Sequence, residues 1–278
     1  MTSDFTHAHL PVVDKPVLRM GLAGNFGADS DDVRWAAERG MNYWVYGVSF
    51  KNVTEGIRDV IHKDREAHVV AMLGMAMAGW QVRRSVEGAL RKLRTDYLDV
   101  FKLGWLGVTS RESAGIYEAL LKLKAEGKLR AIGTSIHDRP RAGRLAEDSP
   151  IDLLMIRYNA KHPGAERDIF PHLAARNPAV VAYTALAWGQ LVRPVKGIEV
   201  PPWPGAEAGP PPLTPALCYR FVLSNSAVHV VLSGPKDRAQ LEENMRALEQ
   251  GPLPEEELAW VRTYGAELHK KRKLDYVR

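Results

Sequence analysis

The sequence predicts an α/β protein folded as a single (β/α)8 TIM barrel. Short β-rich runs alternate along the chain with amphipathic helical segments, which is typical of parallel strands joined by crossover helices. The length of 278 residues also suits such a barrel, which needs about 250. Because no internal repeat or linker divides the sequence, we expect residues 1–278 to form one domain.

Eight runs are predicted to be strands because they combine apolar and β-branched residues between helix and turn signals. They cover residues 18–22, 42–46, 68–73, 98–103, 131–134, 153–158, 180–184 and 229–233. Eight parallel strands are the number that the barrel requires.

Helices are predicted where apolar residues recur every three or four positions. The first is expected to begin after the N-cap residue Asp29 and to end at Gly40. The other predicted helices cover residues 82–93, 111–126, 235–249 and 255–271, so that the chain finishes with two C-terminal helices.

Residues 193–215 follow the seventh predicted strand and contain eight prolines, so they cannot form a long helix. In a barrel this segment lies at the C-terminal rim, where binding sites form. Long loops without secondary structure are usually functional or disordered. We expect a Pro-rich rim loop or lid.

The composition is that of an ordinary globular protein, with 45% hydrophobic and 26% charged residues. The net charge of +5 is concentrated in residues 269–278, which hold five basic residues and one acidic residue. We interpret this tail as a solvated helix end, the alternative being a phosphate or RNA contact. The rest of the chain is nearly neutral, which argues against a nucleic-acid partner.

The sequence contains no apolar stretch long enough for a membrane span and no apolar run near its start. The single cysteine, Cys218, excludes an internal disulfide or a cysteine metal cluster. We therefore expect a cytoplasmic protein whose partner is a small-molecule ligand or substrate. The sequence specifies no oligomeric state.

Four segments resemble the aldo-keto reductase family, in the family's order. They are residues 85–100 (SVEGALRKLRTDYLDV), 127–135 (GKLRAIGTS), 182–189 (AYTALAWG) and 233–244, which includes QLEEN. The resemblance runs from about residue 18 to residue 244. It implies a (β/α)8 barrel that reduces carbonyl compounds with NADPH.

The resemblance also implies an active site of Asp, Tyr, Lys and His, and this sequence has none of the four. The matching positions hold Val45, Phe50, Leu73 and Gly104. A positioned proton donor contributes about 10²–10⁴-fold to such a reaction. Because all four polar residues are replaced together, we expect a divergent site without standard aldo-keto reductase activity, a pseudoenzyme candidate.

The resemblance implies an NADP(H) site that is half retained. Lys236 and Arg238 match positions near a 2′-phosphate, although both also suit the exposed first turn of a helix. Ile136 and Met155 replace two polar residues at the nicotinamide end. The matching candidates are Ser135 and Tyr183 at the nicotinamide end, and Lys236, Arg238, Gln240, Glu243 and Asn244 at the adenine and phosphate end.

Other polar residues fall where strands end, which is where barrels place catalytic groups. His137, Arg157 and His162 follow neighbouring strands and could converge on an anion or carboxylate. Alternatively, His137 belongs to a helix cap, Arg157 faces outward, and His162 is a surface loop residue. Tyr46 is a candidate proton donor at the end of the second strand. No metal site is expected, because no HExxH-type spacing exists.

Lys102 is two residues before Gly104, so both lie on the same face of the fourth strand. If that face points inward, Lys102 lies inside the barrel as a catalytic candidate, with either a lowered pKa or a carboxylate partner. A bulge or register shift would instead turn it outward.

Three functions follow from these observations. The first is a divergent NADP(H)-linked oxidoreductase acting on a small carbonyl compound, with Tyr46 or His137 supplying the proton. The second is a non-reductive lyase, isomerase or dehydratase that uses His137, Arg157 and His162. The third is a regulatory protein that binds NADP(H) or a metabolite without chemistry. We favour the first, because part of the cofactor site is retained.

Overall fold

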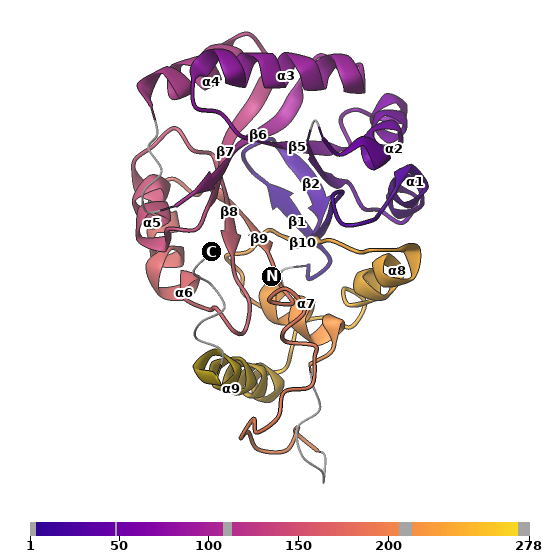
Figure 1. Cartoon of the computed structure of the whole chain (residues 1–278), viewed down its shortest axis with the longest axis vertical. Coiled ribbons are helices and arrows are strands. Elements are labelled where there is room, and N and C mark those ends of the chain that lie inside the picture. The colour runs from indigo at the N-terminus through magenta and orange to yellow at the C-terminus, as the bar shows by residue number, and fades with distance from the viewer. Residues whose placement is uncertain (1–3, 48, 108–112, 206–212, 272–278) are drawn as a thin grey trace.

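The computed structural model describes residues 4–47, 49–107, 113–205 and 213–271. Eight parallel strands close into a barrel in the order β10-β3-β4-β5-β6-β7-β8-β9, and helices surround it (Figure 1). These strands are β3 (Met20–Ala23), β4 (Tyr43–Tyr46), β5 (Val69–Gly74), β6 (Leu98–Leu106), β7 (Leu129–Ile136), β8 (Leu153–Arg157), β9 (Ala179–Tyr183) and β10 (Val230–Ser233). The predicted (β/α)8 barrel is confirmed.

All eight predicted strands are present, with boundaries that differ by at most a few residues. The largest extension is in β6, which continues to Leu106. Its pairing with β7 changes register between Leu103 and Leu106. This irregular stretch contains Gly104, one of the four positions where the resemblance implies a catalytic residue.

The described helices include every helix that the sequence predicts and several that it does not. They are α1 (Ser30–Ala37), α2 (Lys51–Lys63), α3 (Gly79–Leu93), α4 (Ala114–Ala125), α5 (Arg139–Glu147), α6 (Ala165–Asp168), a 3₁₀ turn (Phe170–Ala175), α7 (Pro215–Leu223), α8 (Arg238–Arg246) and α9 (Glu255–Lys271). As predicted, Asp29 caps α1, since its carboxylate accepts the N–H groups of Asp31 and Asp32. Of the basic tail, residues 272–278 lie outside the described residues.

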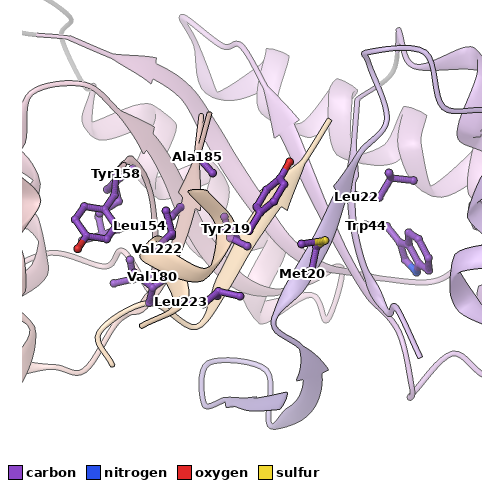
Figure 2. Close-up of a cluster of buried hydrophobic side chains, with 14 of the residues drawn as sticks. Met20, Leu22, Trp44, Leu154, Tyr158, Val180, Ala185, Tyr219, Val222 and Leu223 are labelled. Atoms are coloured by element: carbon purple, nitrogen blue, oxygen red, sulfur yellow. The ribbon is translucent and has the colours of Figure 1, made fainter. Parts of the chain in front are cut away.

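Strand side chains alternate between the barrel interior and the layer beneath the helices. Val45, Ala71 and Met155 belong to a small cluster inside the barrel. The opposite faces of the strands form the main core with the helices (Figure 2). In that core Val222 of α7 is buried with Leu154 of β8.

A hairpin that the sequence does not predict closes the N-terminal end of the barrel. Its antiparallel strands are β1 (His7–Leu10) and β2 (Lys15–Leu18). Leu10, Val13 and Val17 of the hairpin are buried in the interior cluster. Open access to the interior is therefore confined to the opposite, C-terminal end of the strands.

Asp99 of β6 connects the hairpin to the barrel through buried ionic contacts. Its carboxylate lies 2.9 Å from Nζ of Lys15 and 2.8 Å from Nη2 of Arg65. It also accepts the backbone N–H of Val70 at 2.9 Å. Asp99 is fully buried, so its charge depends on these partners.

Two glycines on helices give a matched test of packing. At Gly265 of α9, an added Cβ would overlap the carbonyl oxygen of Ala160, whereas at Gly88 of α3 it would meet nothing within 4 Å. We expect Gly265→Ala to lower the free energy of unfolding by about 1–3 kcal/mol. Gly88→Ala should raise it by about 0.5–1 kcal/mol, because alanine is the better helix former. Urea unfolding of both variants measures the difference, and equal midpoints would contradict the packing of α9.

Candidate functional site

A cavity of about 480 Å³ opens at the C-terminal end of the strands, the end where barrels carry their sites. Its walls come from β3, β4, β5, β8, β9 and β10, from loops that follow these strands, and from α7 and α8. The lining residues are Ala23, Asn25, Phe26, Val45, Phe50, Leu73, Met155, Tyr183, Thr184, Ala185, Leu186, Trp188, Gly189, Arg193, Tyr219, Leu232, Gly234 and Gln240. Its size is within the range of small-molecule sites.

The positions that the resemblance assigns to catalysis form an apolar wall. Val45, Phe50 and Leu73 all line the cavity. At Gly104, an added Cβ would lie 2.6 Å from Sδ of Met75, so Met75 occupies the space that a side chain there would need. This wall holds no group able to donate a proton to a developing alkoxide.

The titratable groups that line the described cavity are Tyr183, Tyr219 and Arg193. The hydroxyl of Tyr219 lies 3.4 Å from Oγ of Ser233. The same Oγ accepts a hydrogen bond from the side-chain amide of Asn244 at 2.9 Å. Burial raises the pKa of Tyr219 to about 12, so its phenol stays protonated at neutral pH.

Tyr183 joins the cavity to a group of basic residues. Its hydroxyl lies 3.1 Å from Nδ1 of His137, and the two rings meet edge to face. Burial raises the pKa of Tyr183, while burial and the charge of Arg157 lower the pKa of His137. A protonated phenol therefore faces a neutral imidazole at pH 7.

Arg157 is the centre of this group. It lies on the inward face of β8, two residues after Met155, and is paired in register with Tyr183 of β9. Burial, followed by the charge of Arg157 and other nearby cations, lowers the pKa of His162 to about 3. The charge of Arg157 thus acts on both histidines. Because Arg157 shares the inward face of β8 with Leu153 and Met155, the alternative of an outward-facing Arg157 is wrong.

His162 is held in place by local contacts. It is nearly buried, and its backbone N–H donates to Oδ1 of Asn159 at 2.9 Å. Its ring meets the ring of His269 from α9 edge to face, with centroids 5.5 Å apart. The interpretation of His162 as a free surface residue is therefore wrong.

Tyr46 is not at the barrel mouth. Its side chain is fully buried in the outer core, together with Trp44 two residues before it. The reason is the alternation of the strand: Val45 faces the interior, so its neighbour faces the helices. The prediction that Tyr46 donates a proton in the site is wrong.

Lys102 does face the interior. It is fully buried, and its Nζ lies 3.4 Å from Sδ of Met155 and 5.8 Å from the centre of the Tyr43 ring. Burial lowers the pKa of Lys102 to about 7. The inward orientation was one of the two alternatives left open by the sequence.

The candidate residues for the adenine and phosphate end surround the start of α8. Gln240 lines the cavity, and its Oε1 accepts the backbone N–H of Lys236 at 3.1 Å. Arg238 lies 2.5 Å from Asp32 and 5.0 Å from the Trp35 ring, so it already has partners. The ammonium of Lys236 is largely exposed. Two further candidates are exposed Glu243 and buried Asn244.

Ser135 is a buried polar group without a partner among the described residues. Its side chain is fully buried, and its Oγ makes no hydrogen bond. It is paired in register with Met155, which lines the cavity. A buried unpartnered hydroxyl is costly, so a ligand that bonds to it would be favoured.

Phe26 was not predicted from the sequence, whereas Trp188 is a rim residue after the seventh predicted strand. Phe26 and Trp188 are both about half exposed and both line the cavity, a combination typical of surfaces that bind planar ligands. Thr184, Ala187 and Trp188 have positive φ angles of 58°, 47° and 59°. Such strained backbone in a loop after a strand often marks a functional segment.

The described part of the Pro-rich loop packs against α9. The indole of Trp260 donates to the carbonyl of Pro201 at 2.8 Å, and its ring lies 4.9 Å from that of Trp203. Arg193, at the start of the loop, lines the cavity. Residues 206–212, where three of the prolines occur, lie outside the described residues.

Searches of the described residues give two further findings. No group of three or more His, Cys, Asp or Glu side chains is arranged to hold a metal ion. None of the described helices has the length and apolar character that crossing a membrane requires.

Comparison with known proteins gives a consistent result. The model of the Aldo/keto reductase family matches residues 29–199. The NADH-specific methylglyoxal reductase of Escherichia coli is 25% identical over 194 residues, which are 60% of this chain and 59% of that protein. The match thus spans less than two thirds of this relative. L-galactose dehydrogenase of Arabidopsis thaliana is 25% identical over 279 residues, covering 82% of this chain and 81% of that protein.

Solved structures show the same fold. An aldo-keto reductase from Bacillus halodurans superimposes with a TM-score of 0.75 at 20% identity, covering 93% of this chain and 96% of that one. An aldo/keto reductase from Klebsiella pneumoniae, in complex with NADP and acetate, superimposes with a TM-score of 0.70 at 20% identity. The match covers 91% of this chain and 93% of that one.

Proposed function

The chain belongs to the aldo/keto reductase family, and we propose that it is an oxidoreductase that binds NADP(H) at the barrel mouth and acts on a small carbonyl compound. One observation carries the proposal: a single cavity connects Tyr183 with Gln240. The family resemblance assigns these residues to the two ends of the cofactor. The Escherichia coli methylglyoxal reductase supports a small carbonyl substrate, although that relative is NADH-specific. The Klebsiella pneumoniae protein in complex with NADP supports the choice of NADP(H).

The residues in the cavity fit such a cofactor. Tyr183 presents an aromatic side chain to the cavity, and Ser135 has an unused buried hydroxyl beside Met155. At the other end, Gln240 lines the cavity and the exposed ammonium of Lys236 is suited to a phosphate. When bound, NADPH supplies a hydride.

Proton delivery must use a route that differs from the family's. The wall made by Val45, Phe50 and Leu73 offers no proton. Tyr183 keeps its phenolic proton at neutral pH because its pKa is raised, and its hydroxyl lies within hydrogen-bond distance of Nδ1 of His137. We assign proton donation to this pair, and we expect it to be less efficient than an active-site tyrosine assisted by lysine and aspartate.

Titration of the purified protein with NADPH and NADP⁺ tests the proposal. We expect saturable binding of both forms, followed by slow oxidation of NADPH in the presence of methylglyoxal and other small aldehydes. The rate should be about 10²–10⁴-fold below that of a relative with the full set of four polar residues. Failure to bind either nucleotide would overturn the proposal.

Lys236 provides a matched test of cofactor choice. We expect Lys236→Ala to weaken NADPH binding about tenfold while NADH binding stays unchanged, because only NADPH carries the 2′-phosphate. Lys270→Ala removes an exposed lysine on α9 and serves as the control. Calorimetric titration of the three proteins with both nucleotides gives the result, and an equal loss for NADH would contradict a phosphate contact.

A second candidate is a protein that binds NADP(H) or a metabolite without turning it over. The apolar replacements Val45, Phe50 and Leu73 in the cavity wall favour it. The same titration separates the two functions: saturable binding with no turnover across the aldehyde panel supports the binding protein.

A further inference from the structure

We propose that the amine of Lys102 is a nucleophile that captures a small aldehyde from the cavity as an imine. The inference rests on the proposed function only in that the cavity admits a carbonyl compound. It requires no cofactor.

Lys102 lies in the barrel interior without a counter-ion. It is fully buried, and the contacts of its Nζ are the thioether of Met155 at 3.4 Å and the face of the Tyr43 ring. None of the ion pairs among the described residues includes it. Burying an ammonium without a carboxylate is expensive, so a stably folded barrel favours the neutral amine. Burial accordingly lowers the pKa of Lys102 to about 7.

The side chain of Met155 touches both the amine and the cavity. Its three rotatable bonds allow it to move aside without displacing the backbone. Leu73, the residue paired in register with Lys102 on β5, lines the cavity as well. The amine therefore lies directly beneath the cavity floor.

The barrel interior also makes room for the lysine stem. A Cβ at Gly133 of β7, which is paired in register with Lys102, would lie 2.9 Å from the lysine Cγ. The absence of a side chain at Gly133 is therefore needed for Lys102 to extend across the interior. A larger residue there would force the amine away from Met155.

A hydroxyl suited to assist the reaction lies one layer above. Ser135 is two residues after Gly133 on the same inward face of β7, and its buried Oγ has no hydrogen-bond partner. The hydroxyl of Tyr43 is likewise buried and unpartnered. The two hydroxyls are thus interior polar groups without a hydrogen-bond partner among the described residues, where Nζ of Lys102 has one hydrogen bond, to the thioether of Met155.

The chemistry balances without an oxidant or reductant. The lone pair of the neutral amine attacks the carbonyl carbon and forms a C–N bond, and a proton passes from nitrogen to oxygen to give a carbinolamine. Loss of that hydroxyl together with the second nitrogen proton releases one water and leaves the imine. Ser135 can donate a hydrogen bond to the departing oxygen. Desolvated lysines of this kind are established nucleophiles toward carbonyl groups.

Reductive trapping tests the proposal on the wild-type protein. Acetaldehyde and sodium cyanoborohydride are added at pH 7 without nucleotide, and the labelled lysines are identified by peptide mass spectrometry. We expect Lys102 to be labelled at least about tenfold more than exposed lysines such as Lys124 and Lys270. The reason is that an ordinary lysine, with a pKa near 10.4, is almost entirely protonated at pH 7.

Two variants sharpen the result. Met155→Ala removes the side chain that covers the amine and should label Lys102 faster. Lys102→Met should lose this adduct while labelling of the exposed lysines is unchanged. Absence of an adduct at Lys102 in both the wild type and Met155→Ala would overturn the proposal. The nucleotide titration reports on the proposed function separately.

Discussion

Replacing Lys102 by methionine is expected to raise the free energy of unfolding at pH 7 by about 4 kcal/mol. The lysine is fully buried among apolar groups, and its pKa falls from 10.5 to about 7 on folding. Each unit of such a shift corresponds to about 1.4 kcal/mol. Methionine fills a similar volume without a charge to desolvate. The gain should appear as a higher urea midpoint with an unchanged m-value.

The increase in the free energy of unfolding caused by Lys102→Met should depend on pH. Between pH 7 and about 10 the unfolded chain holds a proton on Lys102 that the folded protein lacks, so raising the pH stabilises the wild type. The contribution is about 1.4 kcal/mol per pH unit in that window. The difference between the variant and the wild type should therefore shrink toward pH 10. A difference that stays constant from pH 7 to pH 10 would show that Lys102 is charged in the folded protein.

The second large effect is expected at Asp99. Asp99→Asn removes the charge that faces both Lys15 and Arg65 and should lower the free energy of unfolding by about 3–5 kcal/mol. Lys15 is itself almost completely buried, so it cannot turn to water for compensation. Denaturant unfolding at pH 7 measures the loss.

An exposed ion pair gives the control for this experiment. Glu242→Gln on α8 removes the partner of Arg246, which lies 3.7 Å away, and both side chains of this pair are exposed. Such pairs contribute less than about 1 kcal/mol. If the two substitutions lower the free energy of unfolding equally, the burial of Asp99 does not strengthen its ionic contacts and Asp99 does not anchor the hairpin.

Much of the barrel is predictable from the sequence, for a physical reason. A strand buried on both faces is mostly apolar, so runs such as residues 69–73 and 180–183 stand out from the helices between them. Capping residues such as Asp29 mark helix starts equally well. Of the helices that escaped prediction, α2 follows Phe50, which makes no side-chain cap hydrogen bond. α5 and α7 do carry caps, at Asp138 and Thr214, but each helix is only nine residues long, and α7 begins immediately after the Pro-rich loop.

The candidate site is less predictable, because it depends on orientation and not on residue type. Tyr46 and Val45 are neighbours, and a shift of one position decides which of them faces the interior. Lys102 presented the same uncertainty, and only the register with Leu73 and Gly133 resolves it. Contacts between loops, such as that of Tyr183 with His137, depend on three-dimensional packing that a motif does not encode.

Because the hairpin closes the N-terminal end, the interior of the described barrel has a single entrance. Leu10, Val13 and Val17 form the base of the interior, so neither ligand nor water leaves through that end of the barrel. A molecule bound deep in the interior departs only after any molecule bound nearer the entrance has left. Water released at the bottom must leave by the route that the ligand used on the way in, which favours a strict sequence of arrival and departure.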